Sequence, residues 1–185
     1  MRTVAVLDHG SGNLRSAVRA LEAAGAQVVL TSDAQVATEA EGLVVPGVGA
    51  FAHCMDGLRS VDGERILDRR LMAGRPVLGI CVGMQVLFAE GIEHGIQSQG
   101  CGQWPGVVER IEAEVIPHMG WNTVDVAAGS RMFAGVEAER FYFVHSYGVR
   151  EWAMHDAIGP DPQVSWTRHQ GDQFVAAVEH GPLWA

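Results

Sequence analysis

The pattern of apolar and polar residues in the first half of the chain predicts strands that alternate with helices. Four short apolar runs rich in β-branched residues have the character of buried strands, at 3–8, 27–30, 42–47 and 77–80. Apolar residues recur every three or four positions from Leu14 to Leu21, and Gly25 stands where a helix C-terminal glycine is expected. A second helix is expected over Ser60–Met72, ended by Arg75-Pro76. This alternation predicts right-handed crossovers and a parallel sheet.

The second half of the chain has a different pattern, in which strand-like runs are separated by turns with little helix between them. These runs cover 106–111, 120–126, 141–147, 163–168 and 173–181. They are expected to add antiparallel strands to the parallel core. The predicted fold class is therefore α/β, an open and mostly parallel sheet flanked by helices. Because no repeat, low-complexity tract or linker interrupts the pattern, residues 1–185 are expected to form a single domain.

Composition and charge narrow the class of protein. Hydrophobic residues make up 48% of the 185 residues, enough for a large core without a disulfide scaffold. The formal net charge of −9, with no basic cluster, argues against nucleic acid and anionic membranes as partners. The N-terminal residues are expected to form a strand and not a signal peptide, and no membrane-spanning run is present. A cytoplasmic protein is expected.

The chain has three cysteines, Cys54, Cys81 and Cys101. The odd count fits a reducing compartment, and the absence of a Cys-x-x-Cys pair argues against a structural zinc site. No metal or cofactor is expected.

Cys81 stands at a corner where the fourth predicted strand ends and an apolar helical pattern begins. Gly79 and Gly83 flank it with the spacing of a nucleophile elbow, in which a sharp turn strains the nucleophile and brings backbones close together. N–H groups at the start of the following helix are expected to lower the thiol pKa and to hold an oxyanion. A free cysteine is more often simply buried, but the glycines and the strand-to-helix position favour a nucleophile over a buried spacer.

A second glycine cluster, Pro46-Gly47-Val48-Gly49, follows the third predicted strand. It cannot continue a strand regularly, and it is expected at the same edge of the sheet as Cys81. Its backbone N–H groups are candidates for an oxyanion hole, with an ordinary strand-ending turn as the alternative.

A cysteine nucleophile needs a base, and none of the histidines has an obvious orienting carboxylate. The eight histidines are at positions 9, 53, 94, 118, 145, 155, 169 and 180. His145 follows an aromatic strand and is a candidate to reach the site, although a structural hydrogen-bonding role is the commoner one for such a histidine. The chemistry inferred from Cys81 is incomplete within these residues.

Four motifs occur in order along the chain: "PGVGAF", "GICVGMQ", "IPHMGWN" and "YFVHSY". Together, and over the whole chain, they closely resemble the glutaminase subunits of imidazole glycerol phosphate synthase, which are class I glutamine amidotransferases. The second motif alone would indicate the wider class, and the last two narrow the resemblance to this subunit.

The resemblance implies hydrolysis of glutamine by a Cys-His-Glu triad through a glutamyl thioester. It also implies that ammonia passes through a channel to a (βα)8 cyclase subunit. This partner makes imidazole glycerol phosphate and aminoimidazole carboxamide ribotide in histidine biosynthesis.

The resemblance assigns roles to individual residues by motif. Cys81 is implied as the nucleophile, and Val82 N–H with the Val48-Gly49 backbone as the oxyanion hole. Val82 stands where the family commonly has leucine, which is harmless because only its backbone N–H is used.

Further residues are implied to bind substrate or partner. Gln85 and Glu93, expected on the helix after the elbow with Glu90 as an alternative, would hold the α-amino and carboxylate end of glutamine. The backbone around Ser146 and Tyr147 would complete that pocket. The resemblance also implies that Trp121 and Tyr142, which by default would be core residues, lie near the partner face.

One departure from the family pattern is serious. The family's triad His and Glu lie in a "FHPE" motif after a strand like "GPLWA", whereas the sequence stops at Ala185. The triad His and Glu are therefore expected beyond Ala185, and the chain as shown is expected to be an incomplete copy that binds glutamine without hydrolysing it.

Two other functions stay open. One is a non-catalytic glutamine-binding or regulatory subunit of the same fold. The other is a different enzyme with a cysteine elbow, such as a peptidase or a deglycase-like protein, which would leave Gln85 and the "PHMGWN" stretch unexplained.

Overall fold

A seven-stranded mixed sheet forms the centre of the computed structural model, which describes residues 2–152, 154 and 161–185. Its strands are β1 (Thr3–Leu7), β2 (Gln27–Thr31), β3 (Gly42–Gly47), β4 (Val77–Cys81), β11 (Gln163–His169), β12 (Asp172–His180) and β13 (Leu183–Trp184). The order across the sheet is β11-β12-β13-β4-β3-β1-β2. Pairs from β13 to β2 are parallel, and β12 and β11 continue the sheet antiparallel. The predicted α/β class, with antiparallel strands added to a parallel core, is confirmed.

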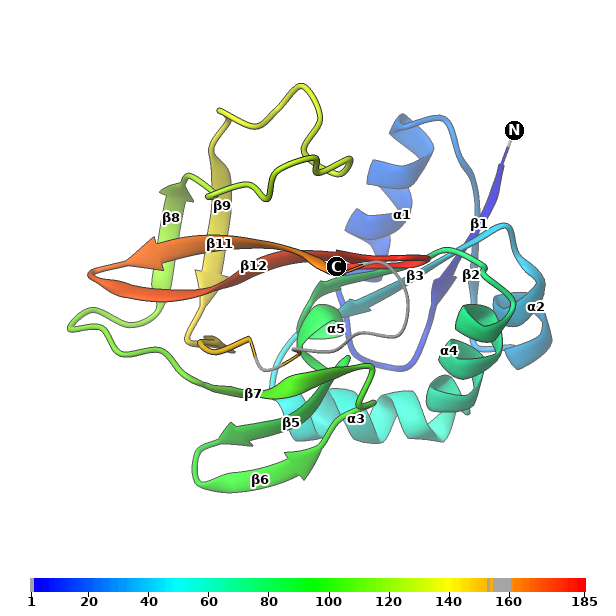
Figure 1. Ribbon diagram of the computed structural model, residues 1–185. Helices are drawn as coiled ribbons and strands as arrows, with labels where there is room; N and C mark the ends of the chain where they lie inside the picture. Colours follow the sequence, from blue (N-terminus) through cyan, green and yellow to red (C-terminus); the bar gives the residue numbers. More distant parts are fainter. Residues whose placement is uncertain (1, 153, 155–160) are drawn as a thin grey trace.

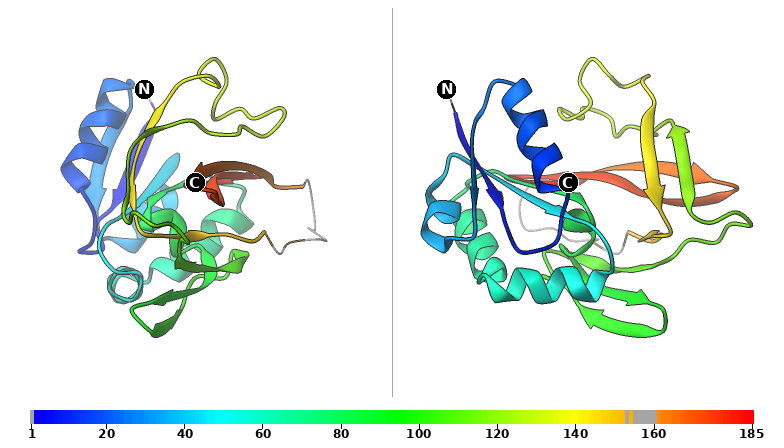
Figure 2. Two further views of the ribbon diagram at one scale, coloured as in Figure 1. Left: turned by 90° about the vertical axis from the view of Figure 1, so that its left-hand side faces the viewer. Right: turned by 180° about the vertical axis from the view of Figure 1, so that it is seen from behind.

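Helices cover both faces of this sheet. They are α1 (Leu14–Ala23), α2 (Ala34–Glu39), α3 (Phe51–Ser60), α4 (Gly63–Met72) and α5 (Val82–Gln85). Helix α1 lies on one face, whereas α2, α3 and α4 gather on the other (Figures 1 and 2). Buried side chains such as Leu7, Val45, Leu67 and Leu87 fill the space between the layers. In the described part of the chain, the helices are all too short or too polar to cross a membrane.

The helix expected over Ser60–Met72 is wrong at its start. Ser60 is the last residue of α3, and α4 begins only at Gly63. Between them Asp62 adopts φ 58°, and a side chain at Gly63 would lie 2.3 Å from Leu58 Cδ1, so the chain reverses tightly there. The sequence analysis did not predict α2, which has only six residues, or α3, although the buried residues of α3 recur at a regular helical spacing: Phe51, Cys54, Met55 and Leu58.

The second half of the chain also forms two smaller sheets, whereas the sequence pattern predicted only strands added to the central sheet. A four-stranded sheet has the order β10-β7-β5-β6. Its strands are β5 (Phe88–Glu93), β6 (Ile96–Gln99), β7 (Trp104–Arg110) and β10 (Tyr147–Val149). A two-stranded ribbon pairs β8 (His118–Asn122) with β9 (Phe141–His145), beside the long β11–β12 hairpin (Figure 1).

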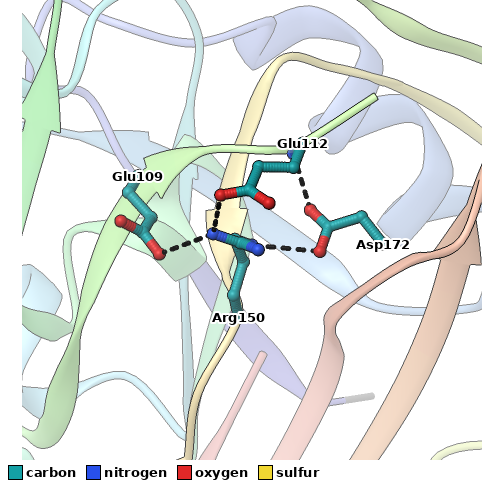
Figure 3. A network of polar contacts seen from close by, with 4 residues as sticks. All are labelled: Glu109, Glu112, Arg150 and Asp172. Carbon is teal, nitrogen blue, oxygen red and sulfur yellow. Dashed lines mark hydrogen bonds and ion pairs between the residues drawn. The ribbon is translucent and has the colours of Figure 1, made fainter. Parts of the chain in front are cut away.

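Arg150 joins the four-stranded sheet to the central sheet (Figure 3). Its Nε donates to Asp172 Oδ1 at 3.0 Å, and its Nη1 lies 3.0 Å from Glu112 Oε1 and 3.4 Å from Glu109 Oε1. The other carboxylate oxygen of Asp172 accepts from the Glu112 N–H at 2.7 Å. This network holds the end of β10 against the start of β12, and β10 begins at Tyr147, beside the site described below.

The fully buried guanidinium of Arg70 on α4 binds backbone carbonyls in place of a carboxylate. Its nitrogens donate to the carbonyls of Ala37, Ala40 and Pro76 at 2.8 Å and of Thr38 at 3.0 Å. Burial lowers its pKa to about 10, so it stays charged at neutral pH. Arg70 thus satisfies the C-terminal end of α2 and the entry to β4 together.

We expect Arg70→Met to lower the free energy of unfolding by about 3–5 kcal/mol, because it leaves several buried carbonyls without a donor. Urea unfolding measures this change. Arg69→Met is the matched control, since Arg69 is exposed on the same helical turn and its loss should cost about 0.5 kcal/mol or less. Equal stabilities of the two variants would contradict this role of Arg70.

Candidate active site

Cys81 is strained at the corner between β4 and α5, as the glycine spacing predicted. It has φ 59° and ψ −120°, a backbone conformation that residues other than glycine rarely adopt. A side chain at Gly79 would lie 2.8 Å from the Gly83 carbonyl oxygen, and one at Gly83 would lie 1.9 Å from the Val45 carbonyl oxygen. Both flanking positions therefore have to be glycine, and the turn holds Cys81 at the carboxyl end of the sheet.

The expectation that the thiol pKa is lowered is wrong for this arrangement. The backbone N–H of Val82 bonds to the sulfur and lowers the pKa, but desolvation is the larger effect and raises the pKa above its ordinary value. Helix α5 spans only four residues, so its dipole is small. A thiol with a raised pKa has to give up its proton before it can attack, so turnover requires a group that takes this proton.

The loop after β3 lies beside Cys81, as expected, because Gly47 pairs with Cys81 in the parallel register of β3 and β4. Two side chains from the β1–α1 turn hold this loop. The Ser11 hydroxyl donates to the Val48 carbonyl at 2.6 Å and receives the Val48 N–H at 3.4 Å. The buried His9 donates from Nε2 to the Pro46 carbonyl at 2.6 Å. The Val48 N–H therefore points at Ser11 in this conformation.

A pocket of about 500 Å³ opens beside Cys81 and brings together most of the residues implied to bind substrate. Its lining includes Cys81, Val48, Gly49, Val82, Gln85, Glu93, His145, Ser146 and Tyr147. Gln85 Nε2 donates to the Tyr147 carbonyl at 2.9 Å, so the elbow and the start of β10 form one wall. A second, largely apolar pocket of about 510 Å³ adjoins it, with Cys81, Gln85, His145 and Ala185 among its lining.

Glu93 lies in this pocket, but its expected place on the helix after the elbow is wrong. Helix α5 ends at Gln85, and Glu93 is the last residue of β5. Residues 88–93 form a strand because β5 pairs with β6 and β7. Gly91 in this strand lies directly against the Phe51 ring, where a Cβ atom would be only 2.5 Å from Phe51 Cγ. Glu93 Oε2 accepts from the Phe51 N–H at 2.6 Å, at the start of α3. Glu90, the alternative, pairs with Gln99 within the small sheet.

Among the residues that the structure describes, no histidine hydrogen-bonds to the sulfur of Cys81; His155 lies outside them. His145 lines the pocket, but its Nδ1 bonds to the Tyr147 carbonyl at 3.0 Å and its Nε2 to His118 Nδ1 at 2.9 Å. The structural role that was the alternative for His145 is therefore the one observed.

Trp121 and Tyr142 lie on the outer face of the β8–β9 ribbon and not in the core. They are directly paired, their rings meet edge to face at 5.6 Å, and they are 61% and 56% exposed. The neighbouring pair on the same face, Met119 and Val144, is also exposed, and Val144 lines the pocket beside Cys81. An apolar surface of these four residues thus reaches the mouth of the pocket.

Burial is the largest effect on the pKa of the other two thiols, and it outweighs the lowering by Ser11 at Cys54 and by Arg59 at Cys101. Burial raises the pKa of Cys54 to about 11 and that of Cys101 to about 12. Within the described residues, no group of three or more His, Cys, Asp or Glu side chains is arranged to hold a metal ion.

Sequence reasoning missed Ser11, His9, His118 and Asn122, which hold the walls of the pocket. A signal existed for the first two, since the "HGSGN" turn follows β1 and so lies at the carboxyl edge of the sheet, where ligands bind. His118 and Asn122 were quoted within the "PHMGWN" motif, but nothing local indicates which side chains they contact.

Comparison with known proteins identifies the family of the chain. The family model "Glutamine amidotransferase class-I" matches residues 5–183. The chain is 62% identical to imidazole glycerol phosphate synthase subunit HisH of Corynebacterium glutamicum, over all of this chain and 88% of that protein. It is 60% identical to the HisH subunit of Thermobifida fusca, over 98% of this chain and 87% of that protein.

The chain therefore belongs to the class I glutamine amidotransferase family. Within that family, the predicted resemblance to the glutaminase subunits of imidazole glycerol phosphate synthase is confirmed, and with it the prediction of a glutamine amidotransferase of histidine biosynthesis.

Solved structures support the fold alone. A crystal structure described as a glutamine amidotransferase matches with a TM-score of 0.70 at 20% identity, over 98% of this chain and 87% of that one. A putative GMP synthase subunit from Thermoplasma acidophilum matches with a TM-score of 0.64 at 20% identity, over 100% of this chain and 82% of that one.

Proposed function

We propose that this chain hydrolyses glutamine at Cys81 and supplies the ammonia to a (βα)8 cyclase subunit, which uses it to make imidazole glycerol phosphate and aminoimidazole carboxamide ribotide. The observation that carries the proposal is the strained elbow of Cys81, with φ 59°, at the wall of a pocket lined by Gln85, Ser146 and Tyr147. The proposed compartment is the cytoplasm, and the proposed organisation is one amidotransferase domain.

The reaction proceeds in two halves. A base takes the proton of Cys81, and the thiolate attacks the carbonyl carbon of the glutamine side-chain amide. The oxyanion that forms is held by the Val82 N–H and by N–H groups of Val48-Gly49. The C–N bond then breaks, the nitrogen takes up the proton and leaves as ammonia, and water attacks the thioester to release glutamate and the free thiol.

A second set of residues binds the end of glutamine that carries the α-amino and α-carboxylate groups. Gln85, Glu93 and the Ser146-Tyr147 backbone line the same pocket as Cys81, where donors and acceptors can bind the α-amino and α-carboxylate groups of glutamine. The Glu93 carboxylate faces the Phe51 N–H and the pocket together, so it supplies negative charge for the α-amino group. These assignments stay predictions.

A second candidate is a non-catalytic glutamine-binding or regulatory subunit. Two observations favour it: the raised pKa of the Cys81 thiol, and the use of both His145 nitrogens by other partners. Both subunits would bind glutamine, and only the enzyme would release ammonia.

The experiment measures glutamine hydrolysis by the full-length protein with and without the cyclase. In the present conformation the Val48 N–H donates to Ser11, so one oxyanion donor is engaged elsewhere. If cyclase binding redirects this N–H, hydrolysis should rise about 10²- to 10³-fold, the usual value of one such donor. Unchanged hydrolysis at a full rate, or failure of the two proteins to co-elute, would contradict the proposal.

A matched pair of variants tests the docking face. Trp121→Ala should weaken cyclase binding and activation, because Trp121 belongs to the apolar surface at the mouth of the pocket. Ile96→Ala is the control, since Ile96 is equally exposed at 61% but lies on β6, in the other small sheet. Equal losses in both variants would argue against the β8–β9 face.

A further inference from the structure

A chain of hydrogen bonds runs through the inner face of the β8–β9 ribbon to the pocket wall. Asn122 Nδ2 contacts His118 Nε2 at 3.2 Å, and His118 Nδ1 contacts His145 Nε2 at 2.9 Å. His145 Nδ1 then contacts the Tyr147 carbonyl at 3.0 Å, which also accepts from Gln85 Nε2 at 2.9 Å. This row of hydrogen bonds therefore ends on the Tyr147 carbonyl oxygen, which joins α5 to β10.

The direction of every bond in this chain follows from its two ends. The Tyr147 carbonyl only accepts, so His145 Nδ1 carries a proton, and in a neutral ring its Nε2 then accepts from His118 Nδ1–H. His118 Nε2 is left to accept from Asn122. The Asn122 amide is oriented independently, because Nδ2 donates to the Arg168 carbonyl at 2.7 Å and Oδ1 receives the Thr123 N–H at 2.9 Å. Both imidazoles are thus neutral and carry their proton on Nδ1.

The surroundings of the pair oppose an added proton. His118 is buried and stacks between Phe143 at 4.9 Å and His169 at 4.4 Å. The titratable groups that face the pair are His169 on β11 and, across the pocket, Cys81. Burial, reinforced by His145 and His169, lowers the pKa of His118 to about 4, and burial also lowers the pKa of His145. An extra proton would set two donors face to face at Asn122 or between the rings.

We propose that His118 and His145 are positioning residues that hold the Tyr147 carbonyl, and through it Gln85, in the arrangement that binds the α-end of glutamine. This inference rests on the proposed function for the identity of the ligand. The two rings do not touch the reacting atoms. Their effect falls on substrate binding, because the two groups that they fix, the Tyr147 carbonyl and the Gln85 amide, are assigned to the α-end of glutamine and not to its reacting side-chain amide.

The first test needs no substitution and no substrate. Nitrogen-15 chemical shifts of the imidazoles report which ring nitrogen carries the proton. At pH 7, His118 and His145 should both be neutral and protonated on Nδ1, and a coupling or cross-peak should connect the two rings. A charged ring, or a proton on Nε2 of either residue, would overturn the assignment even if glutamine is never bound.

The second test separates binding from chemistry. His118→Phe keeps a ring in the stack with Phe143 and His169 but removes both nitrogens. We expect KM for glutamine, in the complex with the cyclase, to rise about tenfold with kcat nearly unchanged, as for the loss of one buried hydrogen bond. His118→Asn, whose amide nitrogen can replace Nδ1 as the donor to His145, should restore part of the affinity.

His169→Phe is the matched control, since it keeps the stack on His118 and lies outside the chain of bonds. Its KM should not change. Thermal unfolding of each variant checks the fold, and Asn122→Ala, which removes the donor at the far end, serves if His118→Phe does not fold. Equal KM values for His118→Phe and the unsubstituted protein would overturn the inference, whereas no glutamine turnover by the unsubstituted complex would contradict the proposed function.

Discussion

Cys81→Ser is expected to abolish glutamine hydrolysis in the full-length protein, by about 10⁴-fold or more, while leaving the fold intact. Serine is nearly isosteric with cysteine and fits the same strained corner, where φ is 59°. Its hydroxyl is far harder to deprotonate and is a poorer nucleophile than a thiolate, so the first bond to the amide carbon does not form. The Val82 N–H and the pocket walls remain, so glutamine should still bind.

Two measurements check this expectation together. Ammonia release gives the loss of hydrolysis, and calorimetry gives the retained affinity for glutamine. A diazoketone analogue of glutamine should also alkylate the unsubstituted protein at Cys81 when the cyclase is present. It should not label Cys54, whose pKa burial raises to about 11.

Cys101→Ser is the control, because Cys101 is half-buried behind α3 and lines neither pocket. Its activity should equal that of the unsubstituted protein. Near-normal hydrolysis by Cys81→Ser would remove Cys81 as the nucleophile. Retained glutamine binding without any alkylation or hydrolysis in the unsubstituted complex would favour the regulatory subunit instead.

The elements around the nucleophile were predictable because their signals are local. The four runs that became β1 to β4 are short, apolar and β-branched; β1, β3 and β4 place buried side chains in the core, whereas the edge strand β2 has none. The glycines at positions 79 and 83 predicted the elbow for a steric reason that the structure repeats, since neither position has room for a Cβ atom. Even the nearness of Gly47 to Cys81 followed from the rule that neighbouring parallel strands end at one edge.

The errors come from contacts between distant parts of the chain. Glu93 was expected on a helix because the apolar spacing of Val86 and Leu87 continues that of α5. Pairing of β5 with β6 and β7 overrides this local preference. The pKa of Cys81 was expected to be lowered because the sequence shows that a helix begins just after this residue. The larger effect is desolvation, which raises the pKa and depends on tertiary packing that the sequence does not show.

The bonds between His118, Asn122 and His145 illustrate the same limit. His118 and His145 are 27 positions apart and meet only because β8 and β9 pair with these two residues opposite each other. Alternation along the ribbon then sorts its residues by face: the histidines point inward, while Trp121 and Tyr142 point outward. Once the register is known, one short ribbon accounts for both a docking face and a support for the pocket.

Gly83→Ala should destabilise the protein and inactivate the elbow, although helix propensity alone predicts the opposite. Alanine at an ordinary helical position is favoured over glycine by about 1 kcal/mol. At Gly83, however, the added Cβ would lie 1.9 Å from the Val45 carbonyl oxygen and 2.9 Å from the Val45 carbonyl carbon. These are backbone atoms of β3 and cannot rotate away as a side chain would.

Relief of that overlap requires α5 to move away from β3. We expect a loss of about 3 kcal/mol or more in the free energy of unfolding, at the upper end for overpacked sites. Because Gly83 is two residues from Cys81, the same movement displaces the sulfur, so alkylation by the diazoketone should also be lost. Gly42→Ala is the control: its Cβ would lie 3.4 Å from Val4 Cγ2, an ordinary contact. Urea unfolding measures the stability of both variants, and diazoketone labelling measures the reactivity of Cys81 in both. A Gly83→Ala protein that is stabilised and labelled normally would show that α5 does not need this close approach to β3.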